Sequence, residues 1–177
     1  MIADSHADYE DGLDAAMRGD YETAYREFQL AAENGLSLAQ YNLAILYFMG
    51  QGVEQNDEQA FFWTREAAQQ GHLGAQYNLG SLYLDGRGVA QDANTGRDWM
   101  ERAARAGHGP AAISLARMLQ ERRPFGRDLV TAHAWAATAN FHESPEAAAE
   151  MTAIEGKLSE QQLAEARRLF ARWQVGL

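Results

Sequence analysis

Apolar residues recur along most of the chain at intervals of three and four, the spacing that predicts amphipathic helices. The first two such stretches run from Asp4 to Arg18 and from Tyr21 to Asn34. Asp20 is placed to cap the second helix, and Gly35 ends it. The pattern therefore predicts a helical hairpin with a very short loop at the start of the chain.

The next helical stretch, Leu38 to Met49, is apolar on nearly every side, and Gly50 ends it. A glycine turn follows, in which Val53 is expected to pack back under the helix ends. A second helix is predicted from Asp57 to Gln70, and Gly71 terminates it. These two helices make a second hairpin.

This second hairpin is repeated with an offset of 36 residues. The segment Ala39–Leu43 reads the same as Ala75–Leu79, and 16 of 36 positions are identical between residues 39–74 and 75–110. A fixed period of this length indicates stacked helical repeats. We therefore predict an all-α fold in which similar hairpins lie side by side.

A third copy begins at Pro110 and is less regular. Arg122 and Pro124 stand where the earlier copies have their two turn glycines, which predicts a different backbone path there. The 36-residue register returns at Asp128, and the repeat signal ends after Phe141.

Two further helices are predicted at the C-terminus. One starts at Ser144-Pro145, and the other has the capping-box pattern from Ser159 to Gln162. A helix with one apolar and one polar face suits the end of a repeat stack. We expect a single repeat domain over residues 1–177, divided into an opening hairpin 1–35, repeats 36–71, 72–107 and 108–140, and capping helices 144–177.

The repeated motif resembles the Sel1-like repeats (SLR), which are relatives of the tetratricopeptide repeats (TPR). The resemblance covers about Gly19 to Asn140 and is carried in the first full copy by Ala39-Gln40, Leu43, Tyr47, Gly50, Gly52-Val53, Trp63 and Ala67-Ala68-x-x-Gly71. It implies a right-handed α-solenoid of antiparallel helix pairs and a role as an adaptor or scaffold, as in many bacterial members. A cysteine-rich branch is linked to β-lactam hydrolysis, but this chain has no cysteine, so that activity is not carried over.

Composition narrows the possible partners and compartments. The formal net charge is -10, which counts against binding to nucleic acid or to anionic lipid. The sequence has no apolar run of 18 residues, so it predicts no membrane-spanning helix. The absence of cysteine fits a reducing compartment such as the cytoplasm, and Met1–Asp4 does not begin a signal peptide. A periplasmic or secreted protein whose leader has been removed stays open.

Candidate chemistry is sparse. His72 and His108 follow the helix-ending glycines, where we expect each imidazole to bond a terminal carbonyl of the preceding helix. No metal-binding His-x-x-x-His or His-Glu-x-x-His spacing, phosphate loop or Gly-x-Ser-x-Gly motif is present. We therefore expect a protein that is not an enzyme and has no cofactor and no metal site.

A helical wheel centred on the packed face at Leu43 places several side chains on the opposite, groove-lining face. Asn42 and Asn78 add amides at its flank. The predicted contact residues for a partner peptide or helix are Leu38, Tyr41, Asn42, Ile45, Phe48, Tyr77, Asn78, Ser81, Leu84, Ile113, Arg117 and Gln120.

Two questions stay open at this point. The apolar surface of residues 38–49 is either an open groove or is covered by the N-terminal hairpin. The function that the pattern favours is a concave-surface adaptor for another protein. The alternatives are a β-lactam-acting hydrolase like the cysteine-rich relatives, which is disfavoured, and an acidic inhibitor or immunity protein of a basic partner.

Overall fold

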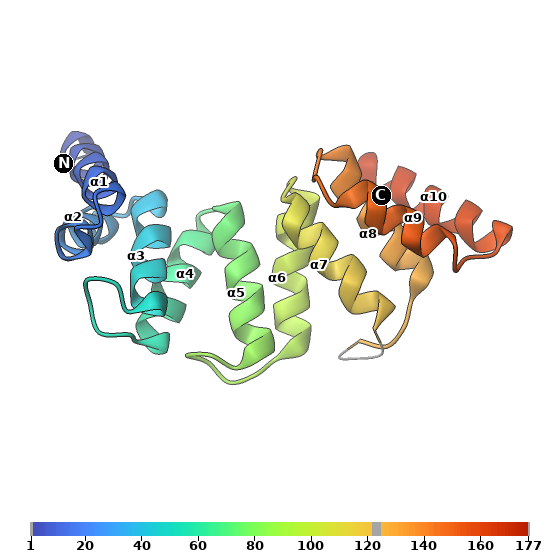
Figure 1. Cartoon of the computed structure of the whole chain (residues 1–177), viewed down its shortest axis with the longest axis horizontal. Coiled ribbons are helices and arrows are strands. Elements are labelled where there is room, and N and C mark those ends of the chain that lie inside the picture. Colours follow the sequence, from blue (N-terminus) through green and yellow to red (C-terminus); the bar gives the residue numbers. More distant parts are fainter. Residues whose placement is uncertain (1, 122–124, 177) are drawn as a thin grey trace. The chain divides into compact units, whose positions relative to one another are not determined.

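The computed structural model describes residues 2–121 and 125–176, and within these ranges it contains ten α-helices and no strand (Figure 1). In chain order the helices are α1 (Ile2–Met17), α2 (Tyr21–Glu33), α3 (Ser37–Met49), α4 (Asp57–Gln69), α5 (Leu73–Asp85), α6 (Ala93–Arg105), α7 (Gly109–Gln120), α8 (Leu129–Phe141), α9 (Ala147–Glu155) and α10 (Glu160–Gln174). The predicted turn that contains Arg122 and Pro124 falls outside the described residues.

The helices form two compact units, Met1–Gly96 and Arg97–Leu177, and the division falls within α6. In the first unit each of the helices α1 to α4 packs against its successor in the chain. In the second unit α7 packs against α8, and α8 packs against both α9 and α10. Within each unit, neighbouring helices therefore pack on one another in sequence order, and the predicted all-α solenoid is confirmed.

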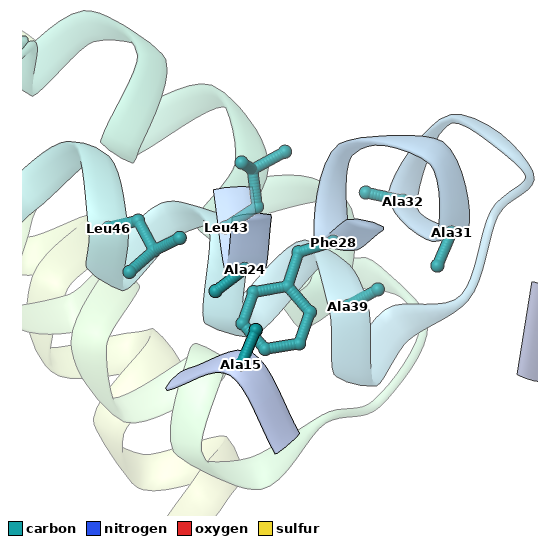
Figure 2. Packing of buried hydrophobic residues seen from close by; sticks show 8 residues of the cluster. All are labelled: Ala15, Ala24, Phe28, Ala31, Ala32, Ala39, Leu43 and Leu46. Atoms are coloured by element: carbon teal, nitrogen blue, oxygen red, sulfur yellow. The ribbon is translucent and has the colours of Figure 1, made fainter. Parts of the chain in front are cut away.

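The core of the first hairpins is built from many alanines around a few large side chains. Phe28 and Leu43 are buried among alanines of α1, α2 and α3 (Figure 2). Alternation of small and large residues lets neighbouring helices approach closely without leaving voids. Val53 packs against the same cluster, so the prediction that it returns under the helix ends is confirmed.

The glycine turn holds successive hairpins together. Gly50 ends α3 in the left-handed conformation, with φ 67°. Gly52 also has positive φ, and a Cβ atom there would lie 2.0 Å from the carbonyl oxygen of Tyr21, the first residue of α2. Gly88 makes the same approach to the carbonyl oxygen of Asp57, the first residue of α4. The second glycine of each turn is therefore required because the loop touches the preceding hairpin.

The repeat geometry continues into α9, further than the sequence pattern indicates. Ala147 lies 36 residues after Ala111, and both are fully buried. Ile154, which follows Leu82 by two repeat lengths, is also fully buried. Helix α9 thus occupies the position of the first helix of another repeat, although the glycine and aromatic letters of the motif are missing.

The C-terminal helix α10 packs on α8. Its N-terminus has the predicted capping box, with Ser159 and Gln162 bonded reciprocally, and the Trp173 ring lies 4.3 Å from the Trp135 ring. The predicted start of α9 at Ser144-Pro145 is corrected, because the helix begins at Ala147 with Glu146 as N-cap.

Candidate functional site

Four of the predicted contact residues line one pocket in the first unit. Ile45 and Phe48 come from α3, and Asn78 and Ser81 come from α5. The pocket has a volume of about 150 Å³ and more apolar than polar surface. The rest of its lining is Ala44, Thr64, Leu82 and Asp85. We call it the α3–α5 pocket.

One wall of this pocket is held in place by the turn that follows α5. The guanidinium carbon of Arg87 lies 3.9 Å from the centroid of the Phe48 ring. The same guanidinium donates two hydrogen bonds to the carboxylate of Asp57, at 3.1 and 2.6 Å. These bonds raise the pKa of Arg87, so the group stays charged. Phe48 therefore has one face covered by a fixed cation.

The tyrosines predicted at this surface are half-buried. Tyr41 stacks on the His72 ring with 4.3 Å between centroids, and Tyr77 occupies the equivalent position one repeat later. Leu38 is exposed at the start of α3, whereas Leu84 lies against the beginning of α6. The two rings are thus neither sealed in the core nor fully open.

The two asparagines have different surroundings. Asn42 donates a hydrogen bond from Nδ2 to the Tyr9 hydroxyl at 3.3 Å, so α1 covers this part of α3. Asn78 lines the α3–α5 pocket instead. The N-terminal hairpin therefore covers the α3 surface near Asn42 and leaves Ile45 and Phe48 at the pocket.

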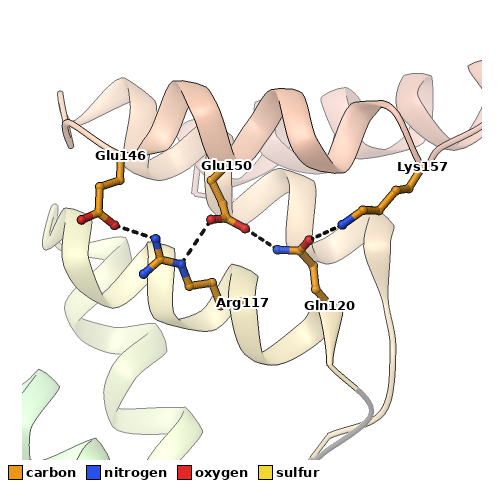
Figure 3. Close-up of polar contacts among 5 residues, drawn as sticks. All are labelled: Arg117, Gln120, Glu146, Glu150 and Lys157. Carbon is orange, nitrogen blue, oxygen red and sulfur yellow. Dashed lines mark hydrogen bonds and ion pairs between the residues drawn. The ribbon is translucent and has the colours of Figure 1, made fainter.

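The three predicted contacts in the second unit face a different environment. Ile113 is only 4% exposed and belongs to the core. Arg117 bonds Glu146 and Glu150 at 2.6 and 3.2 Å. Gln120 donates to Glu150 and accepts from Lys157 (Figure 3). Here α9 occupies the surface that the sequence suggested for a partner.

The histidines at the repeat boundaries have a structural role, but the expected bonding partner is corrected. His72 is the N-cap of α5, and its Nδ1 accepts from the backbone N–H of Ala75 at 3.1 Å. His108 caps α7 in the same way through Ala111. Nδ1 of each imidazole therefore accepts from the following helix, whereas the sequence led us to expect a bond to the preceding one.

We also searched the described residues for metal sites and membrane-spanning helices. Among the described residues there is no group of three or more His, Asp or Glu side chains that could hold a metal ion. None of the helices in that part of the chain is long and apolar enough to cross a bilayer.

Sequence reasoning overlooked Thr64 and Asp85 as pocket residues. A comparison of residue size at each repeat position could have found Thr64.

A family model for the Sel1 repeat matches residues 6–36, 37–72 and 74–108. The chain belongs to the Sel1 repeat family. Sel1 repeat proteins commonly serve as protein–protein interaction scaffolds and are generally not enzymes. A search of curated proteins gave no significant match.

Solved Sel1 structures resemble this chain. A Sel1 repeat protein from Oxalobacter formigenes is 28% identical over 81% of this chain and 59% of its own, with a TM-score of 0.73. The protein c5321, a protective antigen of uropathogenic Escherichia coli with an SLR fold, is 27% identical over 96% of this chain and 45% of its own, with a TM-score of 0.53. This chain thus spans about half to three fifths of their lengths. An immunity protein from Pseudomonas aeruginosa is 17% identical over 96% of this chain and 81% of its own, with a TM-score of 0.41.

Proposed function

We propose that this Sel1 repeat protein is a non-enzymatic adaptor that binds a peptide segment or a helix of another protein. The binding surface is the groove face of α3 and α5 in the first unit. The observation that carries the proposal is the α3–α5 pocket, which is a small apolar cavity with an amide, two hydroxyls and a carboxylate among its lining groups. Apolar pockets rimmed by a few polar groups are typical of binding sites.

The side chains around the pocket suit such a partner. Tyr41 and Tyr77 are half-buried, so they could offer aromatic surface with little loss of side-chain entropy. Asn78 can both donate to and accept from a partner's backbone. This division between apolar anchors and a polar flank is the usual composition of a protein interface.

The proposal is tested with Ile45→Ala and Tyr77→Ala in the full chain. The partner is captured from the native cell with wild-type protein, identified, and its affinity for each variant is measured by calorimetry. We expect each substitution to weaken binding at least about tenfold, because truncated anchors at interface centres commonly cost more than about 1.4 kcal/mol.

The matched control is Leu30→Ala, which truncates an apolar side chain that is 50% exposed on α2, outside the pocket lining. Its affinity should equal that of wild type. Full affinity in both pocket variants would show that the partner binds elsewhere.

A further inference from the structure

We propose that the α3–α5 pocket accepts one large apolar side chain, Phe or Met, from the partner segment, and that a Lys or Arg of the same segment lies beside Asp85. This inference rests on the proposed function and specifies the chemistry of the partner. It follows from a comparison of this pocket with the equivalent places in the neighbouring repeats.

The first observation concerns Thr64, a buried residue in the lining of the pocket. Thr64 follows Phe28 by one repeat length and precedes Met100 by another. All three are buried, with 4%, 2% and 1% exposure. In the opening hairpin the Phe28 ring fills the space beside α1, since a Cβ atom on Gly12 would lie 2.6 Å from it. Thr64 is much smaller, and Phe48 stands one repeat length after Gly12, so here the large ring comes from α3 and both side chains line the α3–α5 pocket.

The second observation is the equivalent surface between α7 and α9. Two repeat lengths separate Ile45 from Arg117, Phe48 from Gln120, Asn78 from Glu150 and Asp85 from Lys157. In the second unit those four later side chains are joined by hydrogen bonds and an ion pair that close the surface (Figure 3). In the first unit the same four positions line the open pocket. The chain thus closes this place with its own side chains in one repeat and leaves it open in another.

The size of the pocket selects the anchor. A cavity of about 150 Å³ with apolar walls accommodates a benzene molecule, and the α3–α5 pocket has about that volume. A phenyl ring or a methionine thioether matches this space, and these are the side chains that the chain itself uses at positions 28 and 100.

The charge beside the pocket selects the neighbouring residue. Asp85 is exposed at the end of α5, and the protein carries a formal net charge of -10. The nearby cation Arg87 forms a bidentate pair with Asp57, and its attraction to Asp85 is the weaker of the two. A basic residue of the partner would therefore be attracted to Asp85, and complementary charge would also speed association.

The test is to pan a random 12-residue peptide library displayed on phage against the full chain, with counter-selection against Thr64→Met. This substitution places a methionine in the pocket, as at position 100. We expect enriched peptides to share a Phe or Met and a Lys or Arg at a fixed spacing. Each synthetic peptide should bind Thr64→Met at least tenfold more weakly than wild type, and Asp85→Asn several-fold more weakly.

Thr64→Val is the matched control, because it keeps the side-chain volume and leaves the pocket open, so peptides should bind it like wild type. A melting curve checks that Thr64→Met is folded. If it is not, Ser81→Leu fills the pocket from α5 instead. A library that yields no peptide that discriminates wild type from the filled variant overturns the proposal.

Two other outcomes also overturn it. Enriched peptides without an aromatic residue or methionine would show that the pocket takes another group. A wild-type chain that dimerises in light scattering while Thr64→Met stays monomeric would assign the pocket to a second copy. If native partner binding is lost in Ile45→Ala but retained in Thr64→Met, the adaptor function stands and only this anchor fails.

Discussion

Among single side chains, the buried glutamines show how the repeat satisfies its helix ends. Gln40 and Gln76 are each 5% exposed, and each Nε2 donates to a carbonyl of the preceding helix, on Ala32 and Ala68 respectively, at 3.2 Å. Gln40 also accepts a bond from Gln70 at 2.7 Å, whereas Oε1 of Gln76 has no hydrogen-bond partner among the residues that the structure describes. The same motif position therefore has both ends of its side-chain amide hydrogen-bonded in Gln40 and only the Nε2 end in Gln76.

We predict that Gln40→Ala destabilises the protein more than Gln76→Ala. The carbonyls of Ala32 and Ala68 still accept from the backbone N–H of Gly35 and Gly71, so loss of either amide removes one buried hydrogen bond, worth about 0.5–1.5 kcal/mol, and Gln40 loses a second bond besides. Urea unfolding of the two variants gives the comparison, with the exposed Gln59→Ala as a control that should change little. An equal loss in both variants would contradict the role assigned to the Gln70 bond.

We also predict that His72 makes stability depend on pH. Burial lowers the pKa of His72 below its ordinary 6.5, and the neutral Nδ1 accepts the capping bond from Ala75. The unfolded chain therefore binds the proton more readily, so stability is full above about pH 6.5 and falls as the pH drops through the folded pKa. The measurement is the free energy of unfolding at pH 7.5 and pH 5.

His72→Asn is the comparison variant, because Asn caps helices well and does not titrate. Its loss of stability between the two pH values should be smaller than that of wild type. Identical losses would mean that other groups account for the pH dependence.

At the scale of helices and loops, the glycine turn lets each hairpin pack closely against the preceding one. Gly88 and Gly71 both have positive φ, at 67° and 89°, so alanine strains the backbone at either place. They differ in surroundings: a Cβ on Gly88 meets the carbonyl oxygen of Asp57 at 2.0 Å, whereas a Cβ on Gly71 has no atom within 4 Å.

We therefore predict that Gly88→Ala costs clearly more than Gly71→Ala. The shared strain is worth about 1–3 kcal/mol, and only Gly88→Ala also pushes the loop off the start of α4. Thermal unfolding of both variants measures the difference. Similar melting temperatures would show that the loop can shift away from the preceding hairpin without loss of stability.

The sequence predicted the helices well because their ends carry explicit signals. Glycines at 50 and 86 and the cap at Asp92, which accepts from the backbone N–H of Asn94 and Thr95, lie where the pattern placed them. Helix α9 continues the register without those signals, because Ala147 and Ile154 keep only the buried size that packing requires. The repeat motif is therefore recognisable in the sequence only as far as Phe141, whereas the pattern of buried residues continues into α9.

The candidate site was less accessible to sequence reasoning. A wheel for one helix puts Ile45 and Phe48 on one face, but it does not show that Thr64 of the next helix lines a pocket between α3 and α5. It also places Arg117 on a groove face, although Arg117 bonds Glu150 of α9 and Glu146, the N-cap of that helix. Contacts between helices far apart in the sequence decide which faces stay open.

At the scale of the whole chain, each stacked hairpin contacts mainly its neighbours in the sequence. A destabilising substitution should therefore lower the stability of nearby helices only. The two compact units meet this description, since each has its own buried side chains, such as Leu43 in the first and Ile154 in the second. Stability is then expected to be a sum of local terms, with regions that open separately rather than one transition for all ten described helices.

We predict that Ile154→Ala and Leu43→Ala destabilise different parts of the molecule. Both side chains are fully buried, and truncation should cost about 2–5 kcal/mol. Hydrogen exchange followed by mass spectrometry should show faster exchange in α8–α10 for Ile154→Ala and in α1–α4 for Leu43→Ala, with little change at the other end. Each variant is the control for the other. If either substitution accelerates exchange equally in every helix, the chain opens as one cooperative body, and a partner on α3 and α5 would then stabilise α10 as strongly as its own site.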